Sequence, residues 1–286
     1  MKIYAILNAD DFGLSPGINR GIIEAYHDGI LTSASLMAVG DAFEQAVTLA
    51  EKHPGLSLGI HLTLVEGIPI LPPEKIPSLL MPEGCFPQSL GTFLLKWLTG
   101  QIRMQEVQQE FAAQIEKALD HRIRVDKLDS HMHLHLLPGI FQAVLAVARR
   151  YGIGAVRLPR ENVVGRVNKQ RVMGIWRRAS LASLSLFRTH QMAKAGFFHP
   201  ARYAGIGESG RLTEEDLLRI FRALRPGVTE IMVHPGYHDS VLDAWPQSRR
   251  YKREQELLAL TSPRVKELVE RQKIELVGYR QVLRSK

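Results

Sequence analysis

Short apolar segments alternate with amphipathic helical segments along this chain of 286 residues, and this alternation restricts its fold more than any other feature. The expected strands cover residues 3–7, 33–39, 56–64, 125–131, 155–158, 229–233 and 274–277. Apolar residues recur at helical spacing from Met104 to Leu119, and Asp41 and Glu44 resemble a capping box that opens a helix to about Lys52. Strands separated by helices form a parallel sheet or barrel, and an α/β barrel of about 250 residues fits this length as one domain.

Composition narrows the class of protein further. A hydrophobic content of 45% is enough for a large core, and the single cysteine, Cys85, excludes an internal disulfide framework and a zinc site built from cysteines. The first residues lead directly into a strand, so we expect no signal peptide. No apolar run reaches the length of about 18 residues that a transmembrane helix needs. These features predict a cytoplasmic protein.

The formal net charge of +8 is concentrated in one part of the chain. No acidic residue lies between Glu161 and Glu208, and the basic residues there are Arg166, Lys169, Arg171, Arg177, Arg178, Arg188, Lys194 and Arg202. Apolar residues interleaved with them are typical of a basic amphipathic helix on an anionic membrane, although a helix packed on the barrel strands explains the same pattern. We expect a basic helical insertion at about 162–207 within one domain, 1–286, and allow for peripheral contact of 166–202 with the inner membrane face.

Two adjacent carboxylates, Asp10 and Asp11, follow the first strand, and Ser15-Pro16 then marks the start of a helix. In α/β folds the edge where strands end and helices begin carries the chemistry. Adjacent like charges repel each other unless a positive group lies between them. The pair therefore indicates either a metal site beside a base or a solvated turn, in which Asp is common.

Three further strand ends carry histidine, namely His61, the run of His131, His133 and His135, and His234. Parallel strands bring such ends to one face, although a single histidine at a strand end is more often a hydrogen-bonded structural residue. A carboxylate with two imidazoles suits a divalent ion, with water in the open positions. On an extended segment the histidines of the run face one side, and we expect one to bind metal, another to contact substrate and the third to have no role.

A metal ion beside a spare carboxylate and a spare histidine is a hydrolase arrangement. The ion makes bound water more acidic and polarises a carbonyl, while the carboxylate takes a proton and the histidine protonates the leaving group. The alternatives are a metal-dependent phosphoesterase on the same scaffold and a basic nucleic-acid-binding protein with a structural histidine cluster. Aromatic residues make up 7% of the chain and do not gather among the basic ones, which argues against the second alternative.

Three motifs in this order resemble those of the YdjC family of carbohydrate deacetylases, which includes the chitooligosaccharide deacetylases. They are NADDFGLS at 8–15, GIH at 59–61 and LDSHMHLH at 128–135. The similarity covers residues 3 to about 160 and returns at 234–236. It implies a distorted (β/α) TIM-like barrel and hydrolysis of an N-acetyl group on an amino sugar, which releases acetate and a free amine.

The same resemblance implies roles for single residues. Asp11, His61 and His131 match the metal-binding positions, with Mg²⁺ or Zn²⁺ as the ion, and Asp10 matches the catalytic base. By analogy with related deacetylases, His234 is the candidate general acid. The candidates for contact with substrate are His133, His135 and Arg157. We also expect Arg157 to orient Asp10, the alternative being a surface ion pair.

Residues 69–77 and 156–161 resemble the branch of this family associated with hopanoid biosynthesis. This branch implies an N-acetylated sugar on a hopanoid glycolipid as substrate, which the basic segment at 166–202 suits. The proline-rich residues 67–88 predict a long loop over the strand ends. We expect no nucleic-acid partner, and we allow for a homodimer.

Overall fold

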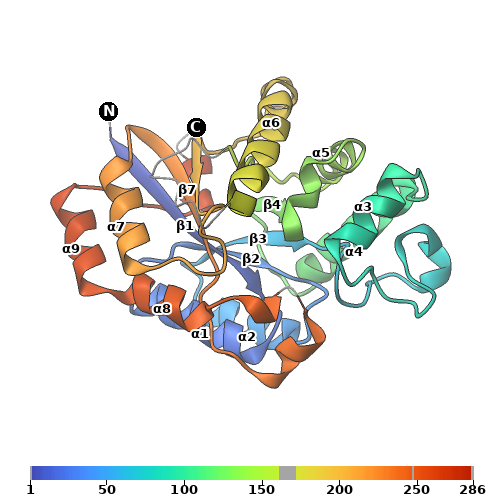
Figure 1. Ribbon diagram of the computed structural model, residues 1–286, viewed down its shortest axis with the longest axis horizontal. Helices are drawn as coiled ribbons and strands as arrows, with labels where there is room; N and C mark the ends of the chain where they lie inside the picture. The colour runs from blue at the N-terminus through green and yellow to red at the C-terminus, as the bar shows by residue number, and fades with distance from the viewer. Residues whose placement is uncertain (1, 161–171, 247, 285–286) are drawn as a thin grey trace.

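Parallel strands form one curled sheet with helices around it (Figure 1). The computed structural model describes residues 2–160, 172–246 and 248–284, and within the helix after the first gap it describes side chains from residue 184 onward. The strands are β1 (Ile3–Phe12), β2 (Ser33–Leu36), β3 (Ser57–Leu62), β4 (Lys127–Ser130), β5 (Ala155–Val156), β6 (Arg202–Ala204), β7 (Gly227–Val233) and β8 (Glu275–Leu276). The α-helices are α1 (Pro16–His27), α2 (Phe43–Lys52), α3 (Leu90–Leu98), α4 (Met104–Asp120), α5 (Ile140–Arg150), α6 (Val172–Ala195), α7 (Glu214–Ala223), α8 (Arg253–Thr261), α9 (Pro263–Arg271) and α10 (Tyr279–Arg284).

The sheet follows the order β5-β4-β3-β2-β1-β7-β6, and β8 adds to β1 through Tyr4 and Ala5. Its described strand pairs are all parallel. A parallel bridge between Ala155 and Phe198 joins β5 to the segment just before β6, so the two edges of the sheet approach each other. The predicted fold, a single α/β domain built as a distorted parallel barrel, is confirmed.

The core lies between the sheet and its helices. Strands of a parallel barrel are covered on both faces, and both β1 from Ala5 onward and the whole of β3 are buried. The predicted start of α1 is confirmed, because the Ser15 side chain accepts a hydrogen bond from the Ile18 N–H and Pro16 is the first helical residue. This cap places the helix directly after the two carboxylates of β1.

The predicted capping box at Asp41 is wrong. Helix α2 begins at Phe43, and its cap residue, Ala42, makes no side-chain hydrogen bond. The Asp41 carboxylate instead accepts a hydrogen bond from Nε1 of Trp245, at 2.9 Å. The hydrogen bond with Trp245, which is distant in the sequence, thus replaces the local cap that Asp41 would otherwise form.

The predicted basic insertion is described only in part, since residues 161–171 lie outside the described residues. Arg188, one of its eight charges, is 2% exposed, and its Nε donates to the Leu136 carbonyl at 3.3 Å. This residue therefore packs inward on the barrel rather than facing solvent. Over the part of the chain that the structure describes, no helix combines the length and the hydropathy that crossing a membrane requires.

Candidate active site

Asp10 and Asp11 lie on β1 itself rather than in a turn after it, because the strand continues to Phe12. Successive side chains of a regular strand point to opposite faces, so two neighbouring carboxylates do not normally share a site. The pairing of β1 with β2 is irregular between Ala9 and Phe12, and Asp11 has a φ of +69°, which is uncommon for a residue other than glycine. With this distortion, both carboxylates line the same cavity.

Asp11, His61 and His131 come together at this cavity. Oδ1 of Asp11 lies 3.7 Å from Nε2 of His61 and 3.6 Å from Nδ1 of His131. All three side chains are buried, and one donor atom from each lies within 4.8 Å of the others. One carboxylate oxygen and two imidazole nitrogens, with room left for water, are a suitable donor set for a divalent ion. The residues present therefore fit a metal centre.

Each of these three residues has its remaining polar atom held by a further buried side chain. Nδ1 of His61 lies 2.8 Å from Asp129, and Nε2 of His131 lies 3.2 Å from Glu66. Oδ2 of Asp11 accepts a hydrogen bond from Arg253 at 2.6 Å. Such outer contacts orient metal ligands and determine which nitrogen of each histidine is free to bind.

Electrostatics favours a positive charge next to Asp11. Burial by itself raises the pKa of Asp11, but Arg253 and His131 outweigh it and hold this pKa well below its usual value. Burial lowers the pKa of His131, yet hydrogen bonds with Asp11 and Glu66 raise it to about 9. The same carboxylates that hold a proton on His131 would attract a metal ion in its place.

Asp10 has different partners from Asp11. Its two carboxylate oxygens each accept a hydrogen bond of 2.7 Å from Arg157, and Asn8 donates to Oδ1 at 2.8 Å. Burial raises the pKa of Asp10, but Arg157 and His61 overcome this and lower it. Asp10, His61 and Asp129 form a second group with converging donor atoms. Both oxygens of Asp10 therefore accept from Arg157, whereas Oδ1 of Asp11 faces the two imidazoles.

Arg157 lies behind Asp10. It is fully buried and also contacts Asp129 and Glu230, at 3.0 and 2.8 Å. The alternative of a surface ion pair is therefore wrong, and the expected contact with Asp10 is present. Because Arg157 is absent from the residues that line the described cavity, its position suits orienting Asp10 rather than touching substrate.

The run of histidines does not form the extended segment that the sequence predicts. Strand β4 ends at Ser130, and His131–Leu136 is a tight turn in which Met132 and His133 have φ values of +56° and +57°. His131 and His133 both line the cavity, whereas His135 does not. His131 reaches Asp11 and His133 lines the cavity. His135 is fully buried, with its ring nitrogens 2.7 Å from the Ser130 hydroxyl and 3.1 Å from the Arg157 carbonyl, so no ring nitrogen is left for a substrate.

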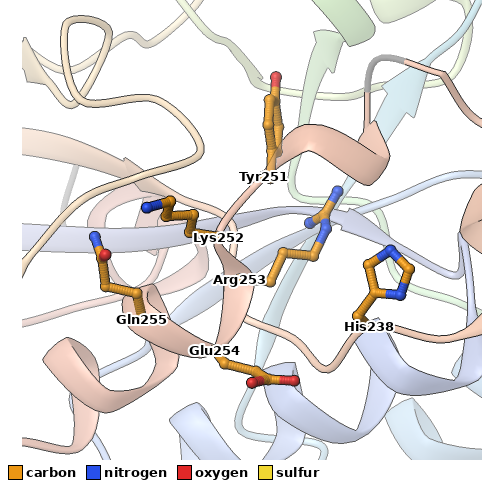
Figure 2. Close-up of a pocket in the computed structure, with 6 residues that line it drawn as sticks. All are labelled: His238, Tyr251, Lys252, Arg253, Glu254 and Gln255. Carbon is orange, nitrogen blue, oxygen red and sulfur yellow. The ribbon is translucent and has the colours of Figure 1, made fainter.

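His234 follows β7 and lines the same cavity as Asp11, His61 and His131. Its backbone N–H donates to Glu256 at 2.5 Å, and its ring packs edge-on against Tyr251, with 4.7 Å between centroids. Tyr251 also lines a neighbouring pocket together with His238 and residues 252–255 (Figure 2). The position suits the predicted role of a proton donor, since the ring lies at the wall of the cavity.

Sequence reasoning missed four residues at this site: Glu66, Arg253, Tyr251 and Glu256. None lies in a recognisable motif, and Arg253 is separated from Asp11 by 242 positions. Glu66 has a φ of +62°, but a left-handed backbone conformation at a residue other than glycine cannot be recognised from the sequence. Asp129 was missed as well, although it had a cue as the second residue of the LDSHMHLH motif.

Comparison with known proteins agrees with this geometry. The family model described as YdjC-like protein matches residues 4–271. A carbohydrate deacetylase of Geobacillus stearothermophilus is 34% identical over 283 residues, which cover 98% of each chain, and a human carbohydrate deacetylase is 31% identical over 82% of this chain and 76% of its own. The crystal structure of an Enterococcus faecalis V583 protein named for cellobiose-phosphate cleavage has 28% identity and a TM-score of 0.80, over 99% of both chains. The chain belongs to the YdjC-like protein family.

Proposed function

We propose that this protein is a metal-dependent hydrolase that removes the N-acetyl group from an amino sugar. The observation that carries the proposal is the meeting of Asp11, His61 and His131 at one cavity, with the carboxylate of Asp10 beside them. The relatives named carbohydrate deacetylase, which align over nearly the whole chain, support the same reaction class.

Asp11, His61 and His131 would hold the ion, and Mg²⁺ and Zn²⁺ are the candidates. When bound, a divalent ion polarises the amide carbonyl and increases the acidity of water. Asp10, oriented by Arg157, accepts the proton of the attacking water as a new C–O bond forms. His234 donates a proton to the amide nitrogen as the C–N bond breaks, so that acetate and a free amine leave. His133 is the histidine of the run that we propose for contact with the sugar, because it lines the cavity.

For the substrate, we propose an amino sugar carried by a hopanoid glycolipid. Residues 69–77 and 156–161, which resemble the hopanoid-associated branch, support this assignment. Leu186 and Phe187 on α6 are 53% and 68% exposed, which provides apolar surface within the basic segment for contact with a lipid. We include peripheral contact with the inner membrane face in the proposal for the same reason.

Metal analysis followed by an assay of acetate release tests the function. The purified protein is expected to contain one divalent ion per chain and to release acetate from N-acetyl sugars, with higher kcat/KM for sugars that carry a lipid tail. Removal of the ion by a chelator should abolish acetate release, and addition of Mg²⁺ or Zn²⁺ should restore it. Full activity in metal-free protein would overturn the proposal, and equal kcat/KM with and without the tail would overturn the glycolipid assignment alone.

A further inference from the structure

The carboxylate of Asp11 has two oxygens, and they face different partners. Oδ1 faces the imidazoles of His61 and His131, at 3.7 and 3.6 Å, whereas Oδ2 accepts a hydrogen bond from Nη2 of Arg253 at 2.6 Å. A carboxylate can bind a cation through one oxygen or through both. The contact with Arg253 therefore bears directly on how Asp11 can bind.

Burying Arg253 at this position lowers the stability of the folded protein. It is 3% exposed, and within the described part of the chain its Nε and Nη1 meet no hydrogen-bond partner. Buried donors without partners reduce stability, and so does a buried ion pair compared with apolar residues of the same size. The ion pair with Asp11 is thus poorly explained as a device for stability.

The surrounding fold nevertheless holds this arginine in place. Its guanidinium lies 5.1 Å from the centroid of the Tyr251 ring, and Arg253 is the first residue of α8. Figure 2 shows its side chain directed away from those of Lys252 and Gln255. A Cβ at Gly236 would lie 3.3 Å from Cδ of Arg253 and 3.0 Å from Cα of Ile18, so the glycine after His234-Pro235 leaves room for the arginine stem.

The backbone of Asp11 needs such support. Its φ of +69° is a strained conformation for a residue with a Cβ, and strain of this kind persists only where neighbours hold it. Asp129 and Glu66 hold the outer nitrogens of His61 and His131 in a similar way. Among the described residues that contact the three candidate metal ligands from outside, Arg253 is the positively charged one, and it contacts the carboxylate of Asp11.

We propose that Arg253 is a positioning residue that holds Oδ2 of Asp11, so that Asp11 binds the cation through Oδ1 alone. Binding through one oxygen leaves more positions on the cation for water and the amide carbonyl. This inference rests on the proposed metal-dependent function and adds a determinant of ligand geometry to it.

Binding of Co²⁺ to metal-free protein tests the inference, because its visible spectrum reports the number and geometry of the ligands. We expect Arg253→Gln to bind Co²⁺ about 10- to 100-fold more weakly than the unsubstituted protein and to show a changed spectrum. Arg253→Lys keeps the charge but not the planar group, so it should recover part of the affinity while the spectrum stays altered. Arg264→Gln is the matched control, because Arg264 pairs with Glu214 and Glu215 at the surface.

The outcomes separate the inference from the function beneath it. If the unsubstituted protein binds no Co²⁺, the proposed metal-dependent function is wrong. If it binds Co²⁺ and Arg253→Gln shows the same affinity and spectrum, the positioning role is wrong while the function stands. Thermal unfolding reports whether each variant folds. Should Arg253→Gln fail to fold, an unchanged spectrum and affinity in Arg253→Lys would overturn the positioning role.

Discussion

Asp10 and Asp11 are neighbours with the same side chain, and their partners give them different chemistry. Asp10 faces Arg157 with both oxygens, whereas Asp11 faces two imidazoles with one oxygen and Arg253 with the other. This difference in partners cannot be predicted from the residue type or from its position in the motif. It arises from the charges that the fold places around each carboxylate.

Asp10→Asn should therefore lower acetate release by about 10²- to 10⁴-fold, the usual contribution of a general base, while the metal content stays unchanged. Asp11→Asn should lose both, because it removes the charged ligand. Elemental analysis and an acetate assay on the same preparations check this, with the exposed Asp28→Asn as control. If the metal content of Asp10→Asn falls to that of Asp11→Asn, the division of roles is wrong.

His135 should make the stability of the protein depend on pH. Burial lowers its pKa from 6.5 to about 3, so the folded protein keeps it neutral while the unfolded chain protonates it below pH 6.5. Its contribution is present above pH 6.5 and is lost as the pH falls, at up to about 1.4 kcal/mol per pH unit.

Urea unfolding at pH 7.5, 6.0 and 5.0 measures this effect. The free energy of unfolding of His135→Asn should be lower than that of the unsubstituted protein at pH 7.5, and the difference should shrink toward pH 5. His27→Gln serves as the control, because the His27 side chain is 73% exposed. A difference that stays constant over this range would contradict the assignment of a buried neutral imidazole.

Helix α4 does more than cover the barrel, because it carries buried acidic side chains that fasten the proline-rich loop. The two carboxylate oxygens of Glu110 accept hydrogen bonds from the backbone N–H groups of Ile70 and Leu71, both at 3.0 Å. Glu106 accepts from the N–H of Ser78 at 2.7 Å. Loop backbone without such partners would be left unsatisfied on burial. Helix α4 thus holds the backbone of the loop at Ile70, Leu71 and Ser78.

Glu110→Ala should destabilise the protein by about 1–3 kcal/mol, because it leaves the half-buried N–H groups of Ile70 and Leu71 without acceptors. Hydrogen exchange at Ile70 and Leu71 should become faster than in the unsubstituted protein. Gln109→Ala lies on the exposed side of the same helix and should change neither quantity. Unchanged exchange at both loop amides in Glu110→Ala would show that the helix does not hold the loop.

The charge of the whole molecule is uneven. The basic interval between Glu161 and Glu208 holds as many positive charges as the net excess of +8, which favours this part of the chain for contact with an anionic surface. Among the basic side chains of this interval that the structure describes, Arg188 is buried against the barrel. A charge-removal experiment should therefore leave Arg188 in place.

Replacing Arg166, Lys169, Arg171, Arg177 and Arg178 by Gln should weaken binding to anionic lipid vesicles, by roughly 1 kcal/mol per contacting residue at most. Acetate release from a soluble N-acetyl sugar should not change. Co-sedimentation with vesicles at low and high salt measures the first effect. A variant with the same number of charges removed from α9 and α10 is the control, and equal binding by all three proteins would contradict membrane contact through this segment.

Periodicity and spacing in the sequence predicted a parallel sheet or barrel and the meeting of the polar clusters at its strand ends. The choice of Asp11, His61 and His131 among those clusters came from the resemblance to the family. Buried parallel strands have a strong apolar signal, and their carboxyl ends share one edge of the sheet by geometry alone. Polar residues placed at several such ends must therefore come close, whatever the details of the loops. The α1 cap at Ser15 was also predictable, because its signal is local.

Other features depended on chain segments that meet only after folding. His131–Leu136 forms a tight turn instead of an extended segment. The carboxylate of Asp41 accepts a hydrogen bond from Trp245 instead of capping a helix. Arg253 contacts Asp11 although 242 positions separate them in the sequence. Hydrogen bonds and ion pairs act over a few ångströms in space and have no fixed spacing along a chain. For this reason the motif placed the candidate metal ligands, while the residues that orient them became visible only in three dimensions.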